Sequence, residues 1–80
     1  MSTEKSNLIP LSEVKEGKTV VLSGVDAGRG LKSRLAAMGL LPGSSLKVVN
    51  NGHPGPFVIS VKGAKLVLGR GAAHKILVRS

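Results

Sequence analysis

The stretch Leu35-Ala36-Ala37-Met38-Gly39-Leu40-Leu41-Pro42-Gly43 decides how this chain folds. Three apolar residues, Leu31, Leu35 and Met38, recur at the i, i+4 and i+7 positions that place side chains on one face of a helix. Gly39 follows at the point where a helix needs a residue that tolerates the left-handed C′ conformation. Pro42-Gly43 then prevents the helix from resuming and favours a turn. The stretch therefore predicts a helix from about residue 28 or 29 to residue 38, followed by a turn into a strand.

Short β-branched runs alternate with turn residues on both sides of this stretch. We expect strands at 18–24, 46–50, 57–61, 64–68 and 75–79, a helical or tight turn at 12–17, and a connector or one 3₁₀ turn at 69–73. Asn51-Gly52 suits a hairpin. About five short strands, with one helix after the first long strand, predict a mostly β fold that closes into a small barrel. The residues expected in its core are Leu35, Met38, Leu41, Phe57, Ile59, Ile76 and Val78.

The composition favours one small cytoplasmic domain. Eighty residues form one domain at most, and 41% of them are hydrophobic, with Phe57 as the single aromatic residue. The absence of cysteine excludes disulfides and thiol chemistry. Residues 1–7 are polar, so we expect a disordered N-terminus before a domain at 8–80, and we expect no signal peptide or membrane span.

The charge of the chain favours an acidic partner. Twelve lysines and arginines against four acids give a formal net charge of +8. This excess suits nucleic acid, an anionic membrane face or an acidic protein surface, and does not choose among them.

No pattern in the sequence indicates catalysis, a cofactor or a metal site. His53 and His74 do not recur with the four acids at the spacing of metal ligands. Gly28-Arg29-Gly30 and Gly69-Arg70-Gly71 do not continue into a phosphate-binding fingerprint. No nucleophile is paired with a base. We therefore expect a protein that is not an enzyme and that binds no cofactor and no metal ion.

The block LAAMGLLPG followed by SSLKVV resembles the signature of the ferrous iron transport protein A family, FeoA. The resemblance extends from about Leu11 to Val78, and it departs from the family at 69–71 and in the glycine-rich loop at 24–30. The positions that carry the signature are Leu35, Met38, Gly39, Leu40, Leu41, Pro42 and Gly43. The resemblance implies an SH3-like barrel that is a cytoplasmic accessory or regulatory protein of bacterial ferrous iron uptake. It also implies a partner, the cytoplasmic GTP-binding region of the FeoB membrane transporter.

A barrel without an active site acts through its surface, and basic residues mark two parts of this one. One part is the polar side of the helix, and the other is the hairpin at 62–65 with the following connector. The candidate partner-binding residues are Arg29, Lys32, Arg34, Leu40, Lys62, Lys65 and Arg70. We expect some of these cations to share a face with Leu40 and to dock on an acidic protein surface. The plainer alternative is scattered solubilising charge.

Two further hypotheses remain open. Residues 17–30 look like the RNA-binding KOW motif, in which a Gly-rich loop leads into another strand, so a small basic barrel that binds RNA or DNA is the alternative function. The amphipathic helix at 31–38 breaks that pattern, and one aromatic residue offers little stacking surface. The C-terminal domain of iron-dependent repressors is similar in structure, although this chain carries no helix-turn-helix.

Overall fold

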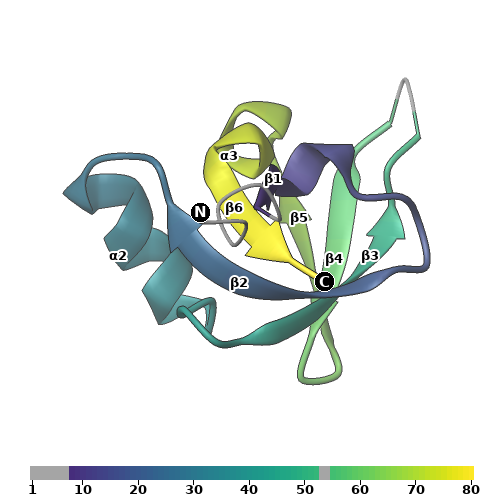
Figure 1. Ribbon diagram of the computed structural model, residues 1–80, viewed down its shortest axis with the longest axis horizontal. Coiled ribbons are helices and arrows are strands. Elements are labelled where there is room, and N and C mark those ends of the chain that lie inside the picture. Colours follow the sequence, from purple (N-terminus) through teal and green to yellow (C-terminus); the bar gives the residue numbers. More distant parts are fainter. Residues whose placement is uncertain (1–7, 53–54) are drawn as a thin grey trace, which may run out of the picture.

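The computed structural model describes residues 8–52 and 55–80 (Figure 1). The expected disorder of residues 1–7 and any role of His53 lie outside the described residues. All five expected strands are present, as β2 (Thr19–Val25), β3 (Ser45–Asn50), β4 (Phe57–Val61), β5 (Ala64–Leu68) and β6 (Ile76–Arg79). A two-residue strand, β1 (Ile9–Pro10), and a 3₁₀ turn, η1 (Leu11–Glu13), precede them. The helices are α2 (Arg29–Ala37) and α3 (Arg70–Lys75).

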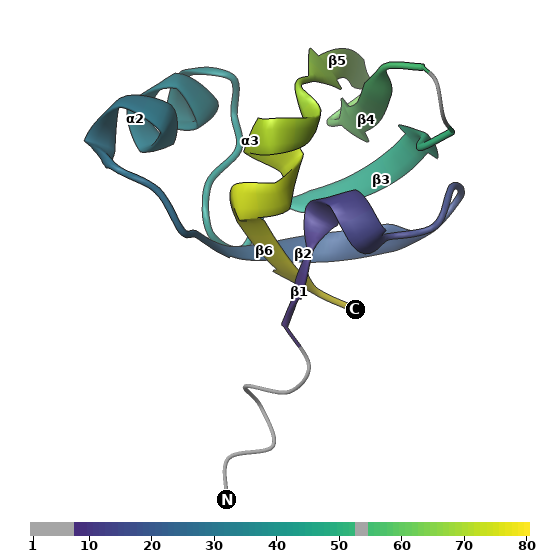
Figure 2. The same cartoon turned by 90° about the horizontal axis from the view of Figure 1, so that it is seen from above.

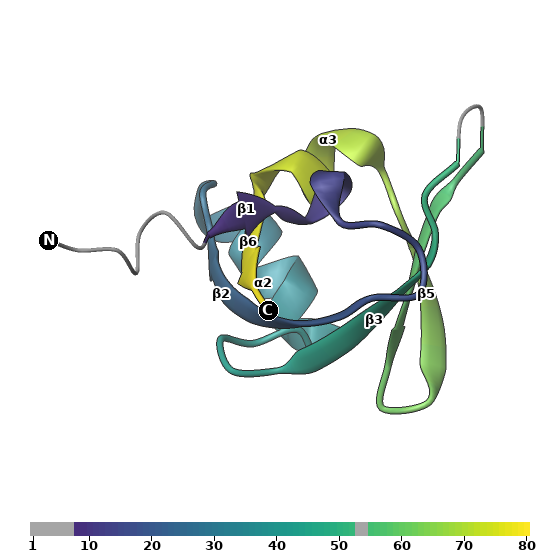
Figure 3. The same ribbon diagram turned by 45° about the vertical axis from the view of Figure 1, so that its right-hand side comes forward.

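The strands form one antiparallel sheet in the order β1-β6-β2-β3-β4-β5. Figure 3 shows the sheet curled round the core, with η1 and α3 beside β1 and β6. Among the described residues no ladder joins β5 to β1, so the barrel is open along that side. The predicted fold class, a mostly β SH3-like fold with a helix after the first long strand, is confirmed, but the expected closure of the barrel is not observed.

The core comes from alternate residues of the strands, as the period of two predicts. In β4 the buried residues are Phe57, Ile59 and Val61, and in β3 they are Leu46 and Val48. The complete core is Leu11, Val14, Val20, Leu22, Leu35, Leu40, Leu46, Val48, Phe57, Ile59, Val61, Leu68, Ala73, Ile76 and Val78. The core prediction was right for Leu35, Phe57, Ile59, Ile76 and Val78.

The segment expected to be a connector at 69–73 is the helix α3, so that prediction is wrong. The helix packs against η1, β1 and β6 (Figure 2), and Ala73 is fully buried there. With six residues, one of them Gly71, α3 is too short to show a helical period in the sequence. Tertiary packing therefore decides its conformation.

Gly39 is the left-handed C′ residue of α2, as the sequence predicts, and the helix ends there in a Schellman motif. Gly39 has φ +90°, and its N–H donates to the carbonyl of Ala36 at 3.0 Å. The N–H of Leu40 donates to the carbonyl of Leu35 at 2.8 Å. This motif places the residue after the glycine against the last helical turn. Leu40, which is only 3% exposed, therefore enters the core together with Leu35.

The prediction that Met38 and Leu41 belong to the core is wrong. Met38 is 41% exposed and Leu41 is 51% exposed. Met38 is the C-cap residue of α2 and lies just outside the helix, whereas Leu41 lies beyond Gly39, where the left-handed residue reverses the direction of the chain. Leu40 is buried at this end of α2, whereas Met38 and Leu41 remain at the surface.

We expect Gly39→Ala to lower the free energy of unfolding by about 1 kcal/mol, because an L side chain is strained at positive φ. Gly30→Ala is the matched control, since Gly30 is the second residue of α2 and is not among the glycines with positive φ, so that the substitution should cost no stability. At both sites an added Cβ meets no atom within 4 Å, so the difference reports backbone conformation alone. Chemical denaturation measures it, and equal midpoints for the two variants would contradict the assignment.

Candidate functional site

A groove of about 390 Å³ separates α2 from the end of β2. It is lined by Gly24, Val25, Lys32, Ser33, Ala36, Leu40, Leu41 and Pro42. The helix contributes Lys32, Ser33 and Ala36, and Ala36 is a surface neighbour of both others, at i+4 from Lys32 and i+3 from Ser33. Ser33 and Ala36 have short side chains, which leave space between the helix and the strand. Figures 1 and 2 show α2 standing out from the sheet at one end of the molecule.

One wall of the groove is a tight turn that follows Leu40. The N–H of Ser44 donates to the carbonyl of Leu41 at 2.9 Å. Pro42 at the second position and Gly43, with φ +93°, at the third are the residues that a type II turn requires. The turn therefore holds the exposed Leu41 on a defined backbone.

Hydrogen bonds to β2 and to the end of α2 anchor this turn. The N–H of Gly43 donates to the carbonyl of Leu22, and the N–H of Leu22 donates to the carbonyl of Ser44, both at 2.8 Å. The Ser44 hydroxyl accepts from the N–H of Leu41 at 3.1 Å and donates to the carbonyl of Gly39 at 3.2 Å. Leu41 is thus positioned by the sheet and by the helix end together.

Two of the three predicted helix cations lie along the groove side of α2. Arg29, Lys32 and Arg34 are all exposed. Arg29 shares a stripe with Lys32 and Ala36, at i, i+3 and i+7. Arg34 is turned by about 140° from Arg29 around the helix axis, so it lies on another side of α2.

The hairpin cations do not join the helix cations. Lys62 lies in the β4–β5 turn and Lys65 in β5, and both are exposed. In Figures 1 and 2 this hairpin and α2 lie apart along the long axis of the molecule. The helix cations and the hairpin cations therefore form two separate groups.

Leu40 does not belong to a surface site, because it is only 3% exposed. Its neighbour Leu41 supplies the exposed apolar side chain that we expected from Leu40. Gly39 could have predicted this result, because the residue that directly follows the left-handed glycine of a Schellman motif packs against the last turn of the helix.

Arg70 forms contacts within the domain. Its guanidinium donates from Nη1 to Oδ1 of Asn51 and from Nη2 to the carbonyl of Gly52, both at 2.9 Å, and lies 5.8 Å from the centre of the Phe57 ring. Nδ2 of Asn51 donates to the carbonyls of Ser12 and Val14 at 3.1 and 2.7 Å. Arg70 therefore joins α3 to the residues before β4 rather than standing free for a partner.

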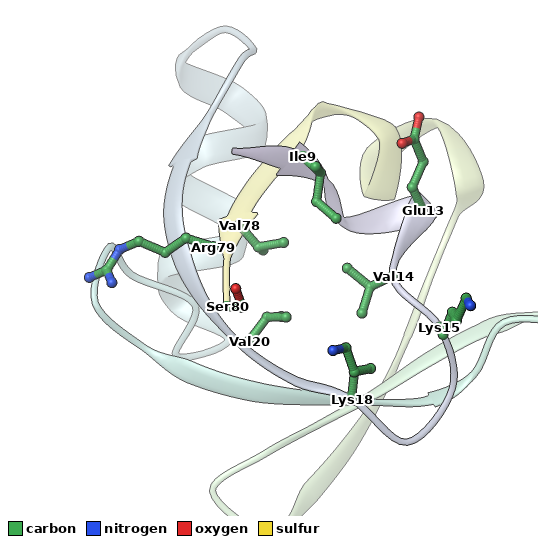
Figure 4. A pocket seen from close by; sticks show the side chains of 9 residues that line it. All are labelled: Ile9, Glu13, Val14, Lys15, Lys18, Val20, Val78, Arg79 and Ser80. Atoms are coloured by element: carbon green, nitrogen blue, oxygen red, sulfur yellow. The ribbon is translucent and has the colours of Figure 1, made fainter. Parts of the chain in front are cut away.

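A second hollow, of about 310 Å³, lies beside β1, β2 and β6. Figure 4 shows four apolar side chains around it, from Ile9, Val14, Val20 and Val78, with Lys18 beside them. Arg79 also belongs to its lining, although its guanidinium points away in this view. The sequence offers no signal for this hollow, because its walls come from segments at opposite ends of the chain.

Among residues 8–52 and 55–80, no group of three or more His, Asp or Glu side chains is arranged to hold a metal ion. His74 is exposed, and its Nδ1 lies 3.5 Å from the hydroxyl of Ser12. No helix in the described part of the chain has the length and apolarity needed to cross a bilayer.

These features define the chain as a small SH3-like barrel with an inserted helix and an apolar groove at that helix. The model of the FeoA domain matches residues 9–80, and the chain belongs to the FeoA domain family. It is 46% identical over 71 residues to a protein of Methanocaldococcus jannaschii that is provisionally named Fe(2+) transport protein A. That match covers 89% of this chain and 85% of the relative.

Solved structures show the same fold. A crystal structure of an iron uptake regulatory protein (FeoA) is 32% identical, with a TM-score of 0.80 over 90% of this chain and 94% of the other. A manganese-dependent transcriptional repressor in complex with manganese is 26% identical, with a TM-score of 0.83. That match covers 91% of this chain but only 36% of the repressor, so the likeness is to one part of a longer protein.

We expect opposite outcomes for two adjacent leucines. Leu40→Ala removes a buried side chain and should lower the free energy of unfolding by about 2–5 kcal/mol. Leu41→Ala removes a half-exposed one and should cost less than about 1 kcal/mol. Urea denaturation of both variants tests the assignment, and a larger loss for Leu41→Ala would reverse it.

Arg70→Met should lower the free energy of unfolding by about 1–2 kcal/mol, because it leaves Oδ1 of Asn51 without its charged donor. Lys62→Met serves as the control for loss of one positive charge and should stay within about 0.5 kcal/mol of the wild type. Thermal unfolding at two salt concentrations measures both. Equal stability of the two variants would show that Arg70 is a surface charge.

Proposed function

We propose that this protein is a non-enzymatic accessory protein of ferrous iron uptake. In this proposal it docks on the cytoplasmic GTP-binding region of the FeoB transporter. Membership of the FeoA domain family supports the iron context, together with the likeness to a protein named for Fe(2+) transport. The surface that we assign to docking consists of Arg29, Lys32, Leu41 and Pro42 and is called the α2 docking surface.

The observation that carries the proposal is the exposure of Leu41 in the lining of the groove. Leu41 is 51% exposed, so its complete burial under a partner contributes about 1 kcal/mol. This contribution corresponds to a factor of about 5 in Kd. The groove between Ala36 and Val25 adds room for an apolar side chain of the partner.

The cations of the α2 docking surface favour an acidic partner. Arg29 and Lys32 are exposed along the groove side of α2, at the border of the apolar residues. Charges at the rim of an interface speed the encounter more than they strengthen the complex. Added salt should therefore slow association, while the apolar contacts keep the complex together.

The proposed role is one of binding, at the cytoplasmic face of the membrane. The α2 docking surface offers apolar contact and positive charge, which recognise a partner without reacting with it. An RNA-binding role is the alternative. It is disfavoured because α2 occupies the place where the KOW pattern needs a strand.

The test is a titration of ¹⁵N-labelled protein with the cytoplasmic domain of the cognate FeoB, followed by NMR and calorimetry. We expect shifts concentrated in residues 29–42. Leu41→Asp should weaken binding at least about tenfold, because it buries a charge in the apolar centre. Lys32→Glu should weaken it less, by roughly threefold, mainly through slower association.

Lys62→Glu is the control, since it makes the same charge change at the far hairpin and should alter the Kd by less than about twofold. Equal losses for Lys32→Glu and Lys62→Glu would mean that net charge, rather than this surface, drives binding. A parallel titration with a mixed RNA pool separates the classes of function. Tight RNA binding that weakens steeply with salt, with no response to FeoB, would overturn the proposal.

A further inference from the structure

Strand β5 forms one edge of the sheet. Within the part of the chain that the structure describes, it pairs only with β4. The unpaired N–H and C=O groups of an edge strand are a template for another strand. The opposite edge, β1, has two residues and contains Pro10, which limits such pairing. Strand β5 has five residues and no proline, so it is the accessible edge.

The register identifies the backbone groups that face outward. Lys62 and Gly63 both have positive φ, at 52° and 83°, and form the two-residue turn of a type I′ hairpin. In such a hairpin the pairs alternate between bonded and non-bonded, starting with the bonded pair Val61 and Ala64. Lys65 and Val67 therefore occupy non-bonded positions opposite β4. Their N–H and C=O groups point to the open edge.

The side chains of the same two residues lie on the outer surface. Val67 is 70% exposed, the largest value among the exposed large hydrophobic residues described, and Lys65 is exposed beside it. In the ladder between β4 and β5, Val67 pairs with Val58 and Lys65 pairs with Ser60. Ser60 in turn pairs with Lys47, so a basic row runs across the sheet next to an apolar one.

We propose that the β5 edge accepts an extended, acidic segment of another protein as an additional antiparallel strand. The segment would place an acidic residue beside Lys65 and an apolar residue beside Val67, two positions apart and so on one face. Charge favours another protein over a second copy of this chain, because each copy carries +8 and pairing the two edges would bring Lys47 and Lys65 toward their counterparts. This inference goes beyond the proposed docking through α2 and uses a separate surface.

The probe for the edge is a blocked heptapeptide, Thr-Val-Thr-Val-Thr-Glu-Thr, added to the ¹⁵N-labelled full chain. We expect the amides of Lys65 and Val67 to shift and their hydrogen exchange to slow. A peptide with lysine in place of glutamate should bind about fivefold more weakly, because it sets like charges side by side. Equal affinity for the two peptides would overturn the proposed chemistry.

Val67→Pro removes an outward N–H, while the bonds of Leu66 and Leu68 to β4 remain. It should abolish peptide binding, whereas Val67→Thr, which keeps both the N–H and the branched shape, should change affinity less than about threefold. If Val67→Pro does not fold, Lys65→Glu is the second test. This variant should bind the lysine peptide more tightly than the glutamate peptide, the reverse of the wild type. An unchanged preference would refute the pairing.

Leu41→Asp separates this inference from the proposed function. The variant should bind FeoB at least about tenfold more weakly and keep full peptide binding, because Leu41 lies on the α2 docking surface. Peptide-induced shifts at residues 29–42 would place the peptide on α2 and overturn the edge assignment. Light scattering that detects a dimer of the wild type, lost in Val67→Pro, would assign the edge to a second copy instead.

Discussion

The left-handed backbone at Gly39 determines which side of the following segment faces water. With φ at +90°, the chain turns back so that the N–H of Leu40 reaches the carbonyl of Leu35. Leu40 is thereby buried, and Leu41 faces outward on a turn that is bonded to β2. The same backbone angle thus ends the helix, completes the core and produces the exposed part of the candidate site. The core and the candidate site therefore both depend on the backbone of one residue that has no side chain.

Sequence reasoning succeeded where a local rule decides the structure. The strands β4 and β5 begin and end at the predicted residues, because a period of two between turn residues leaves little choice of register. It failed for Leu40 and Leu41 because both residues follow the end of the helix, where the helical period no longer says which side chain is buried and the left-handed backbone of Gly39 decides instead. It also missed α3, whose six residues gain their stability from packing against η1 and not from their own pattern.

For the candidate site, prediction from the sequence is limited in another way. The sequence gives the number of charged residues but not their positions in the folded protein. Arg29 and Lys32 lie along the groove because they share a helical stripe, which the spacing does predict. Arg70 is bound to Asn51, 19 positions away, and only the packing of α3 brings the two together. The groove exists because Ser33 and Ala36 have small side chains. Small residues in a helix predict a groove only when the strand that they face is known.

Two small apolar surfaces set apart on one rigid barrel have a physical advantage over a single larger one. A contiguous patch that combined Met38, Leu41 and Val67 would favour self-association, whereas separate patches on a chain of charge +8 keep the copies apart. Each patch alone provides a weak contact, of about 1–2 kcal/mol from the apolar area that remains to be buried. In the two docking proposals, a first contact at one surface would hold the other at a high effective concentration near its target. Affinity and selectivity would then come from geometry, because only a target that presents both complementary surfaces at the right separation would engage the two together.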